Sequence, residues 1–370
     1  MKITILSHNL SSNAAMRAHR LALAARTFAD VKLIGPVERH GPWPALPTES
    51  WIHSVEEKRL PRFFLSLLQL VDLADGDVLI AVKPHLASFG AGLIAAEKRQ
   101  VPLILDHDDL DTALAPRSDW ATHPSMADLR RPASAIYLSL LTKASPGASA
   151  ITVASTMLQK KFGGTLVPHG SFTDIFDPAK IDRASARAQF GFTGPTVLFA
   201  GTPRWHKGLK PLAKAVSKTP GARLAVLCRP EDLSDAQWQK YPLLRVPMLS
   251  YLDFPKLLAA ADVVAIPQLD TEATRYQMPM KVYDCMAMAK PVVASAISDL
   301  PSVLEGCGRL VPPGEVAPLA AAIGDLLNNP EAARALGTKA RARCLENYSI
   351  EVVGQKLAGV VEKLIGTRRS

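Results

Sequence analysis

The chain has 370 residues, of which 48% are hydrophobic and 21% are charged, and its formal net charge is +9. This length exceeds what one ordinary hydrophobic core needs and predicts two domains. No apolar run approaches the roughly 20 residues of a membrane-spanning helix, and the start of the chain lacks a signal-peptide pattern, so we expect a cytoplasmic protein.

The first half of the chain alternates strand-like and helix-like segments. Strand patterns are predicted at residues 2–8, 30–36, 77–84, 101–109 and 148–155. Apolar residues recur at helical spacing over 14–28 and near 87–99. Strands that alternate with helices are typical of a parallel, doubly wound sheet.

The same order restarts after "LVPHGSFTDIFDP" (166–178), a segment rich in Pro, Gly and Asp that we interpret as a linker. The second half has predicted strands at 195–202, 222–228, 261–268, 290–295 and 308–313 and predicted helices at 207–219, 253–261 and 282–289, with two more helices over 329–366. We therefore predict two Rossmann-like domains. Ligands are expected beyond the carboxyl ends of the strands, in a cleft between the domains.

The positive charge is spread over both parts of the chain. Residues 1–170 hold 18 Lys+Arg against 15 Asp+Glu, and residues 171–370 hold 25 against 19. No dense basic run marks a nucleic-acid-binding module, so we expect no nucleic-acid partner. The distribution favours a small phosphate-bearing ligand held mainly by the second half. The four cysteines lack zinc-ligand spacing and are expected to be free thiols.

The stretch "FAGTPRWHKG" (199–208) favours an anion-binding loop. A buried strand ends at Gly201, and a helix is predicted to begin near Lys207. Backbone N–H groups at a helix start bind anions, and Arg204 and Lys207 would add positive charge there. The alternative is an ordinary loop with solvated basic side chains.

The stretch "QMPMKVYDCMAMAKPVVAS" (277–295) places Pro279 and Lys281 before a helix and Asp284 about one turn into it. A carboxylate at this place hydrogen-bonds ribose hydroxyls in dinucleotide-binding folds. Taken alone, Asp284 is more simply an acid near the positive end of a helix.

The stretch "LDHDDLD" (105–111) gathers acids around His107 at one strand end. The histidine would polarise a bound group or relay a proton there. The acids Asp106, Asp108, Asp109 and Asp111 suit either Mg²⁺ or Mn²⁺ binding or capping of the loop. We favour a functional site here over a metal site.

Two apolar stretches, Leu60–Leu73 and Ala133–Lys143, have helical spacing. Core helices show this pattern more often than helices at a membrane surface do. Peripheral membrane contact is therefore the alternative interpretation.

Together these stretches resemble the retaining glycosyltransferases of family 4, which have the GT-B fold. "VPHGSFTDIF" is similar to the family's V-P-N/H-G-V-D-T-x-x-F linker, with Phe172 where aspartate is usual, and "FAGTPRWHKGL" is similar to its F-x-G-…-K-G loop. "YLDFPKLLAAADVVAIPQ" resembles L-Y-x-x-A-D-V-x-V-x-P, and "PMKVYDCMAMAKPVVAS" resembles P-x-K-L-x-E-Y-M-A-x-G-x-P-V-V-A-S. The resemblance covers nearly the whole chain and is stronger after Val167.

The resemblance implies a donor site in the second domain. It matches Lys207 to the lysine of the phosphate loop and Asp284 to the ribose-binding glutamate, and Arg204 replaces an arginine that this loop lacks. The remaining implied donor-binding residues are Gly201, Met280, Lys281 and Val282.

In the first domain, His107 matches the family's histidine near the donor sugar. Besides Phe172, two places depart from the family pattern: Tyr276 stands where an E-x7-E motif has an acid, and residues 13–15 replace a Gly-Gly loop.

The resemblance also implies the domain plan and the activity. Residues 1–170, together with a crossing helix at about 350–370, would form the acceptor-side domain, and residues 171–349 the nucleotide-sugar-binding domain. The implied reaction moves a sugar from a nucleoside-diphosphate sugar to a hydroxyl of a sugar, lipid-linked or small-molecule acceptor. It proceeds with retention and without metal, in glycan, glycolipid or glycosylated-metabolite biosynthesis, and no cofactor is expected besides the donor substrate.

Two alternatives accompany this expectation. The chain could be a non-catalytic GT-B subunit that scaffolds a partner transferase, as the departures at Tyr276 and Phe172 would suit. The second alternative is that the cytoplasmic protein associates with the inner face of the membrane.

Overall fold

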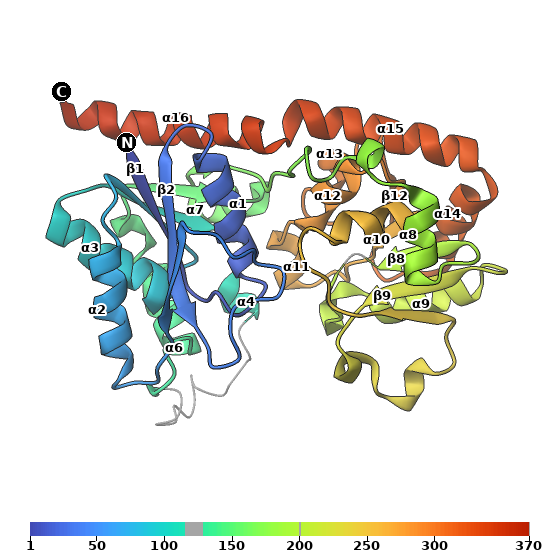
Figure 1. Cartoon of the computed structure of the whole chain (residues 1–370), viewed down its shortest axis with the longest axis horizontal. Helices are drawn as coiled ribbons and strands as arrows, with labels where there is room; N and C mark the ends of the chain where they lie inside the picture. The colour runs from blue at the N-terminus through green and yellow to red at the C-terminus, as the bar shows by residue number, and fades with distance from the viewer. Residues whose placement is uncertain (115–128, 200, 370) are drawn as a thin grey trace. The chain divides into compact units, whose positions relative to one another are not determined.

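The computed structural model describes residues 1–114, 129–199 and 201–369 (Figure 1). The chain forms two compact units. Unit 1 contains Met1–His169 and the helix that begins at Ile350, and unit 2 contains Gly170–Ser349. The sequence patterns placed this division at residue 170.

Unit 1 is built on a seven-stranded sheet of order β3-β2-β1-β4-β5-β6-β7, with every pairing parallel. The strands are β1 (Lys2–Ser7), β2 (Asp30–Val37), β3 (Ile52–Glu56), β4 (Val78–Val82), β5 (Leu103–His107), β6 (Ala150–Val153) and β7 (Thr165–Leu166). The α-helices are α1 (Ala15–Ala25), α2 (Phe63–Leu73), α3 (Ala91–Arg99), α4 (Asp111–Leu114), α6 (Ala135–Lys143), α7 (Thr156–Phe162) and α16 (Ile350–Arg369). The central strands β4 and β5 are buried along their whole length, as expected for strands covered on both faces.

Unit 2 has a six-stranded parallel sheet of order β10-β9-β8-β11-β12-β13. Its strands are β8 (Thr196–Phe199), β9 (Arg223–Leu227), β10 (Leu243–Val246), β11 (Val263–Ile266), β12 (Val292–Ser295) and β13 (Arg309–Val311). Its α-helices are α8 (Arg183–Phe190), α9 (Leu209–Ser217), α10 (Phe254–Ala260), α11 (Glu272–Tyr276), α12 (Lys281–Ala287), α13 (Leu300–Val303), α14 (Val316–Asn328) and α15 (Pro330–Asn347). The predicted pair of doubly wound parallel sheets is confirmed.

The edge strands β3 and β10 were not predicted. The strand β3 has the sequence IHSVE, and three of its five residues are exposed. The strand β10 has only four residues, LLRV, of which one is buried. An edge strand has one neighbour and needs less apolar sequence, so its pattern is weak.

The helix predicted over 207–219 begins later than expected. A 3-10 turn at Trp205–Lys207 precedes α9, which starts at Leu209. Gly208 between them has a left-handed backbone with φ of +70°, and a Cβ on it would lie 1.7 Å from the carbonyl oxygen of Pro267. Only glycine fits both conditions, so the loop turns here before the helix can start.

The last helix, α16, belongs to unit 1 and packs on α1. A Cβ on Gly354 would lie 2.4 Å from Thr27 Oγ1 and 2.7 Å from the carbonyl oxygen of Ala24, so the two backbones approach closely at this glycine. Among the helices that the structure describes, none is long and apolar enough to cross a membrane.

Candidate functional site

The loop after β8 carries three of the residues predicted to bind the donor. A Cβ on Gly201 would lie 3.7 Å from Lys207 Cδ, so the lysine side chain runs beside this glycine. Lys207 is half-buried and Arg204 is exposed, while Ala200 of the same motif lies outside the described residues. The structure therefore brings Gly201 and Lys207 together, with Arg204 at the 3-10 turn that follows.

This loop is fixed to the loop that follows β11. The backbone N–H of Leu269 donates to the carbonyl oxygen of His206 at 2.9 Å, and Gly208 lies against Pro267. Because β8 and β11 are parallel neighbours, their carboxyl ends lie at the same edge of the unit 2 sheet. The two strand ends thus form one continuous polar edge.

The helix α12 starts at the same edge. The segment that leads to it is tied to the end of β11 by Gln268 Nε2, which donates to Gln277 Oε1 at 3.1 Å. Asp284 in the first turn is 1% exposed, and its Oδ1 accepts a hydrogen bond from Ser171 Oγ at 2.9 Å. The acid is therefore held in place by a residue 113 positions away.

The other predicted residues of the α12 segment differ in burial, and Met280 and Lys281 are half-buried. Met280 is the N-cap residue, and Val282 is fully buried. The Lys281 ammonium lies over the ring of Phe254, with Nζ 3.9 Å from the ring centroid, a cation–π contact. This contact directs Lys281 toward an aromatic face, whereas the sequence interpretation directed it toward a diphosphate.

His107 in unit 1 is the last residue of β5 and is buried. Its ring stacks on Phe162 with centroids 4.1 Å apart, and its Nε2 lies 3.2 Å from Ser145 Oγ. Burial lowers the pKa of His107 to about 4. The imidazole is therefore neutral near pH 7 and offers a hydrogen bond there, not a positive charge.

The acids around His107 divide into two groups. Asp106 is fully buried and pairs with Arg17, whose Nη2 and Nε donate to its two oxygens at 2.7 and 2.9 Å. Arg17 also donates to the carbonyl oxygens of Pro168 and Val167. This buried pair ties β5 to α1 and to the end of unit 1.

The second group surrounds Lys83, which follows β4 with a left-handed φ of 68°. Its Nζ lies 2.8–2.9 Å from oxygens of Asp108, Asp109 and Asp111. Burial opposes the charge of Lys83, yet the three carboxylates raise its pKa well above the ordinary value. Burial raises the pKa of Asp108 to about 7. The ammonium thus occupies the point where these acids converge.

Within the described residues, no group of His, Cys, Asp and Glu side chains is arranged to hold a metal ion. Neither Arg17 nor Lys83 was predicted as part of this cluster. Arg17 lies in an alanine-rich helical segment, and nothing in its neighbourhood along the chain indicates a buried partner.

Comparisons with known proteins place one family match in unit 2. Residues 194–329 match the family described as glycosyl transferases group 1. The MMP alpha-(1->4)-mannosyltransferase of Mycolicibacterium hassiacum is 38% identical over 120 residues, which are 32% of this chain and 28% of the relative. A GDP-mannose-dependent monoacylated alpha-(1-6)-phosphatidylinositol monomannoside mannosyltransferase of Corynebacterium glutamicum is 28% identical over 216 residues, 53% of this chain and 55% of the relative.

The matches span between 28% and 55% of the length of the first four curated relatives. Among solved structures, HepE from Anabaena in complex with UDP-glucose superposes with a TM-score of 0.74 at 18% identity, over 98% of this chain and all of the other. At that identity the likeness shows the fold alone. The fold is that of the GT-B glycosyltransferases, as the sequence predicted.

Proposed function

We propose that this chain, whose residues 194–329 belong to the glycosyl transferases group 1 family, transfers a sugar from a nucleoside-diphosphate sugar to an acceptor hydroxyl with retention of configuration. One observation carries the proposal. The family match falls on the unit whose sheet edge holds Gly201 and Lys207 in one loop and Asp284 on the adjoining helix. The solved complex of HepE with UDP-glucose supports a donor of this class.

The chemistry requires stabilisation of negative charge on the departing nucleoside diphosphate. Lys207 and Arg204 would supply fixed positive charge, and the first N–H groups of α9 would donate hydrogen bonds to the phosphate oxygens. This arrangement needs no metal ion. Asp284 would accept hydrogen bonds from the ribose, since Ser171 fixes its orientation. His107, as a neutral imidazole, would hydrogen-bond the donor sugar.

A binding panel of UDP-, GDP-, ADP- and dTDP-sugars, measured by NMR or thermal shift on the full chain, tests the proposal. We expect one base to bind, and we expect Lys207→Ala and Asp284→Asn each to weaken it by roughly tenfold or more, equivalent to ~1.4 kcal/mol. Asparagine keeps an oxygen that can accept from Ser171, so the local structure should survive.

Lys218→Ala is the matched control, because Lys218 is exposed at the other end of α9. Its affinity should equal that of the wild type. Unchanged affinity in both site variants would refute the site. Donor binding without transfer to any acceptor in a broad panel would favour the scaffold alternative.

The acceptor is proposed to be lipid-linked and presented at a membrane surface. The outer face of α2 exposes Phe64, Leu65 and Leu68 by 56–58%, and the exposed Arg59 and Arg62 precede them. Apolar side chains next to arginines are typical of peripheral membrane helices. The corynebacterial relative named above is a phosphatidylinositol monomannoside mannosyltransferase, which supports this class of acceptor.

Cosedimentation with phosphatidylglycerol vesicles tests the membrane contact. We expect the wild type to bind and the double variant Phe64→Ser, Leu68→Ser to stay in the supernatant. Ile94→Ser, which removes an exposed isoleucine from α3, is the control and should bind as the wild type does. Equal binding by all three proteins would exclude this face.

A further inference from the structure

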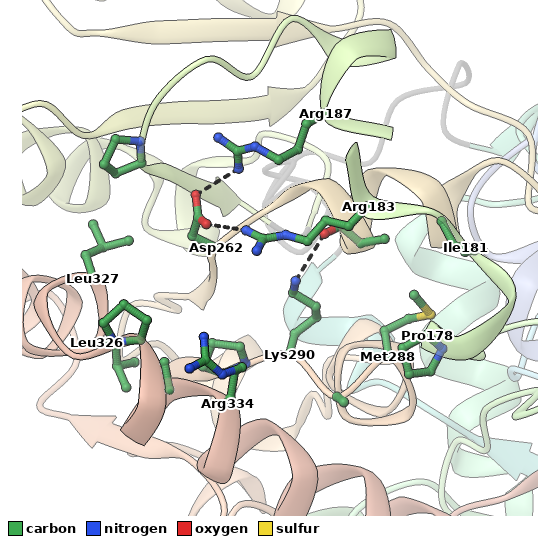
Figure 2. Close-up of a pocket in the computed structure, with 16 residues that line it drawn as sticks. Pro178, Ile181, Arg183, Arg187, Asp262, Met288, Lys290, Leu326, Leu327 and Arg334 are labelled. Carbon is green, nitrogen blue, oxygen red and sulfur yellow. Dashed lines mark hydrogen bonds and ion pairs between the residues drawn. The ribbon is translucent and has the colours of Figure 1, made fainter. Parts of the chain in front are cut away.

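Unit 2 contains a cavity at the edge of its sheet opposite to the proposed donor site (Figure 2). The donor residues follow the strands, whereas the cavity is lined by residues that precede them: Pro195 before β8, Asp262 before β11, and Lys290 with Pro291 before β12. Since all strands of this sheet are parallel, the two places lie at opposite ends of the strands. The cavity volume is about 400 Å³, within the range of small-molecule sites.

The walls carry a surplus of positive charge. The lining includes four cationic side chains, Arg183, Arg187, Lys290 and Arg334, and one carboxylate, Asp262. Asp262 pairs with both Arg183 and Arg187, as Figure 2 shows. Arg187 also donates to the carbonyl oxygens of Ala260 and Gly194. These contacts hold Arg187 in place. The cavity still has more cationic than anionic side chains in its lining.

Lys290 is buried, and its contacts satisfy only part of its hydrogen-bonding capacity. It is 9% exposed, and its Nζ donates to the carbonyl oxygens of Ala261 at 2.5 Å and Ala259 at 3.3 Å. An ammonium has three N–H groups, so two carbonyls leave one for the cavity. Among the described residues, no carboxylate lies within ion-pair distance of this Nζ. Burial and the nearby Arg183 lower the pKa of Lys290 to about 8. A buried cation with neutral partners is costly unless an anion joins it.

Arg334 is exposed on α15, and its guanidinium has no hydrogen bond or ion pair to any described residue. Its donors are therefore available to a ligand in the cavity. The rest of the wall is apolar and includes Leu326, Leu327 and Met288. Cationic donors beside an apolar wall suit a molecule with an anionic head and a compact apolar body.

We propose that this cavity binds an organic phosphate monoester with a compact apolar group, through Lys290 and Arg334 and independently of the sugar donor. A dianionic phosphate would balance the two cations that no carboxylate of the described residues contacts, and its oxygens would accept from the guanidinium of Arg334 and from the remaining N–H of Lys290. The apolar group lies against the leucines. The site is separate from the donor site in position and in ligand.

Calorimetric titration of the full chain with phenyl phosphate tests the proposal, and the same titration of Lys207→Ala, which should bind phenyl phosphate as tightly as the wild type, separates this cavity from the proposed donor site. We expect saturable binding that phenol does not reproduce and that is several-fold weaker for benzoate and for inorganic phosphate. We expect Arg334→Gln to weaken phenyl phosphate binding about tenfold. This variant should fold normally, because Arg334 is exposed and has no partner to lose.

Arg309→Gln, a change of an exposed arginine outside the cavity, is the matched control and should leave the affinity unchanged. Four results would overturn the proposal: no binding of phenyl phosphate, equal binding of phenol, equal binding of benzoate, or equal affinity of Arg334→Gln and the wild type. None of these results depends on transferase activity, so the proposed function stands or falls separately.

Discussion

The two units treat buried cations differently, although both are parallel sheets of similar design. In unit 1, Arg17 faces one carboxylate and Lys83 faces three at 2.7–2.9 Å, so both of these buried cations have anionic partners inside the protein. In unit 2, Lys290 is held by carbonyl oxygens, and Lys281 lies over an aromatic ring. The first arrangement stabilises the fold without a ligand. In the second, no carboxylate of the described residues lies within ion-pair distance of Lys290, which suits the anion site proposed in this unit.

The largest effect is expected when a matched cation of unit 1 is removed. Arg17→Met leaves the carboxylate of Asp106 buried without its ion partner, which costs about 3–5 kcal/mol. Urea denaturation of the full chain measures this loss. Lys98→Ala removes an exposed pair with Asp72 in the same unit and should cost under about 1 kcal/mol. Similar losses in both variants would show that the buried pair contributes no more to stability than the exposed pair does.

The buried neutral His107 of unit 1 should make the stability of the protein depend on pH. The folded-state pKa of His107 is about 4 against an ordinary 6.5, so the unfolded chain takes up a proton first as the pH falls. Stability from this group is present above pH 6.5 and is lost between 6.5 and 4, by about 3 kcal/mol.

The difference between the wild type and His107→Gln isolates this contribution. Asp108 acts in the opposite direction, since its raised pKa of about 7 makes the folded chain gain stability as the pH falls toward 4. In urea denaturation at pH 7, 6, 5 and 4.5, the free energy of unfolding of the wild type relative to that of His107→Gln should decrease as the pH falls. Parallel pH profiles would contradict the buried neutral state.

A smaller effect is expected when the cation of unit 2 is removed. Lys290→Met loses two hydrogen bonds to carbonyl oxygens but strands no carboxylate and relieves the burial of an ammonium. These terms oppose each other, so the net change should stay within about 1 kcal/mol at pH 7. The same urea assay measures it. If Lys290→Met lost as much free energy of unfolding as Arg17→Met does, the proposed difference between the two units would be wrong.

Sequence patterns could predict the sheets because strand and helix periodicity is local. The donor loop was also visible, since Gly201, Arg204 and Lys207 lie within seven residues of each other. The partners of the buried charges were not visible. Arg17 and Asp106 are 89 positions apart, and Ser171 and Asp284 are 113 apart. In the sequence, Lys290 looks like the polar start of a strand. Its carbonyl partners lie at the carboxyl end of α10, 29 and 31 positions earlier in the chain, so no local pattern indicates them. Such pairs arise from tertiary placement and have no periodic pattern.

The smallest effect concerns the proton of Lys290 and the proposed phosphate ligand. Arg183, Arg187, Asp262 and Cys285 are the titratable groups that act on this ammonium. An anion stabilises the protonated form of Lys290, and phenyl phosphate is a dianion only above about pH 6, so it should bind best near pH 7 and weaken several-fold as the pH rises from 7 to 9. Calorimetry at three pH values measures this slope. In Lys290→Met the slope should vanish while Arg334 still gives weak binding, and a slope that persists in this variant would assign the titration to another group.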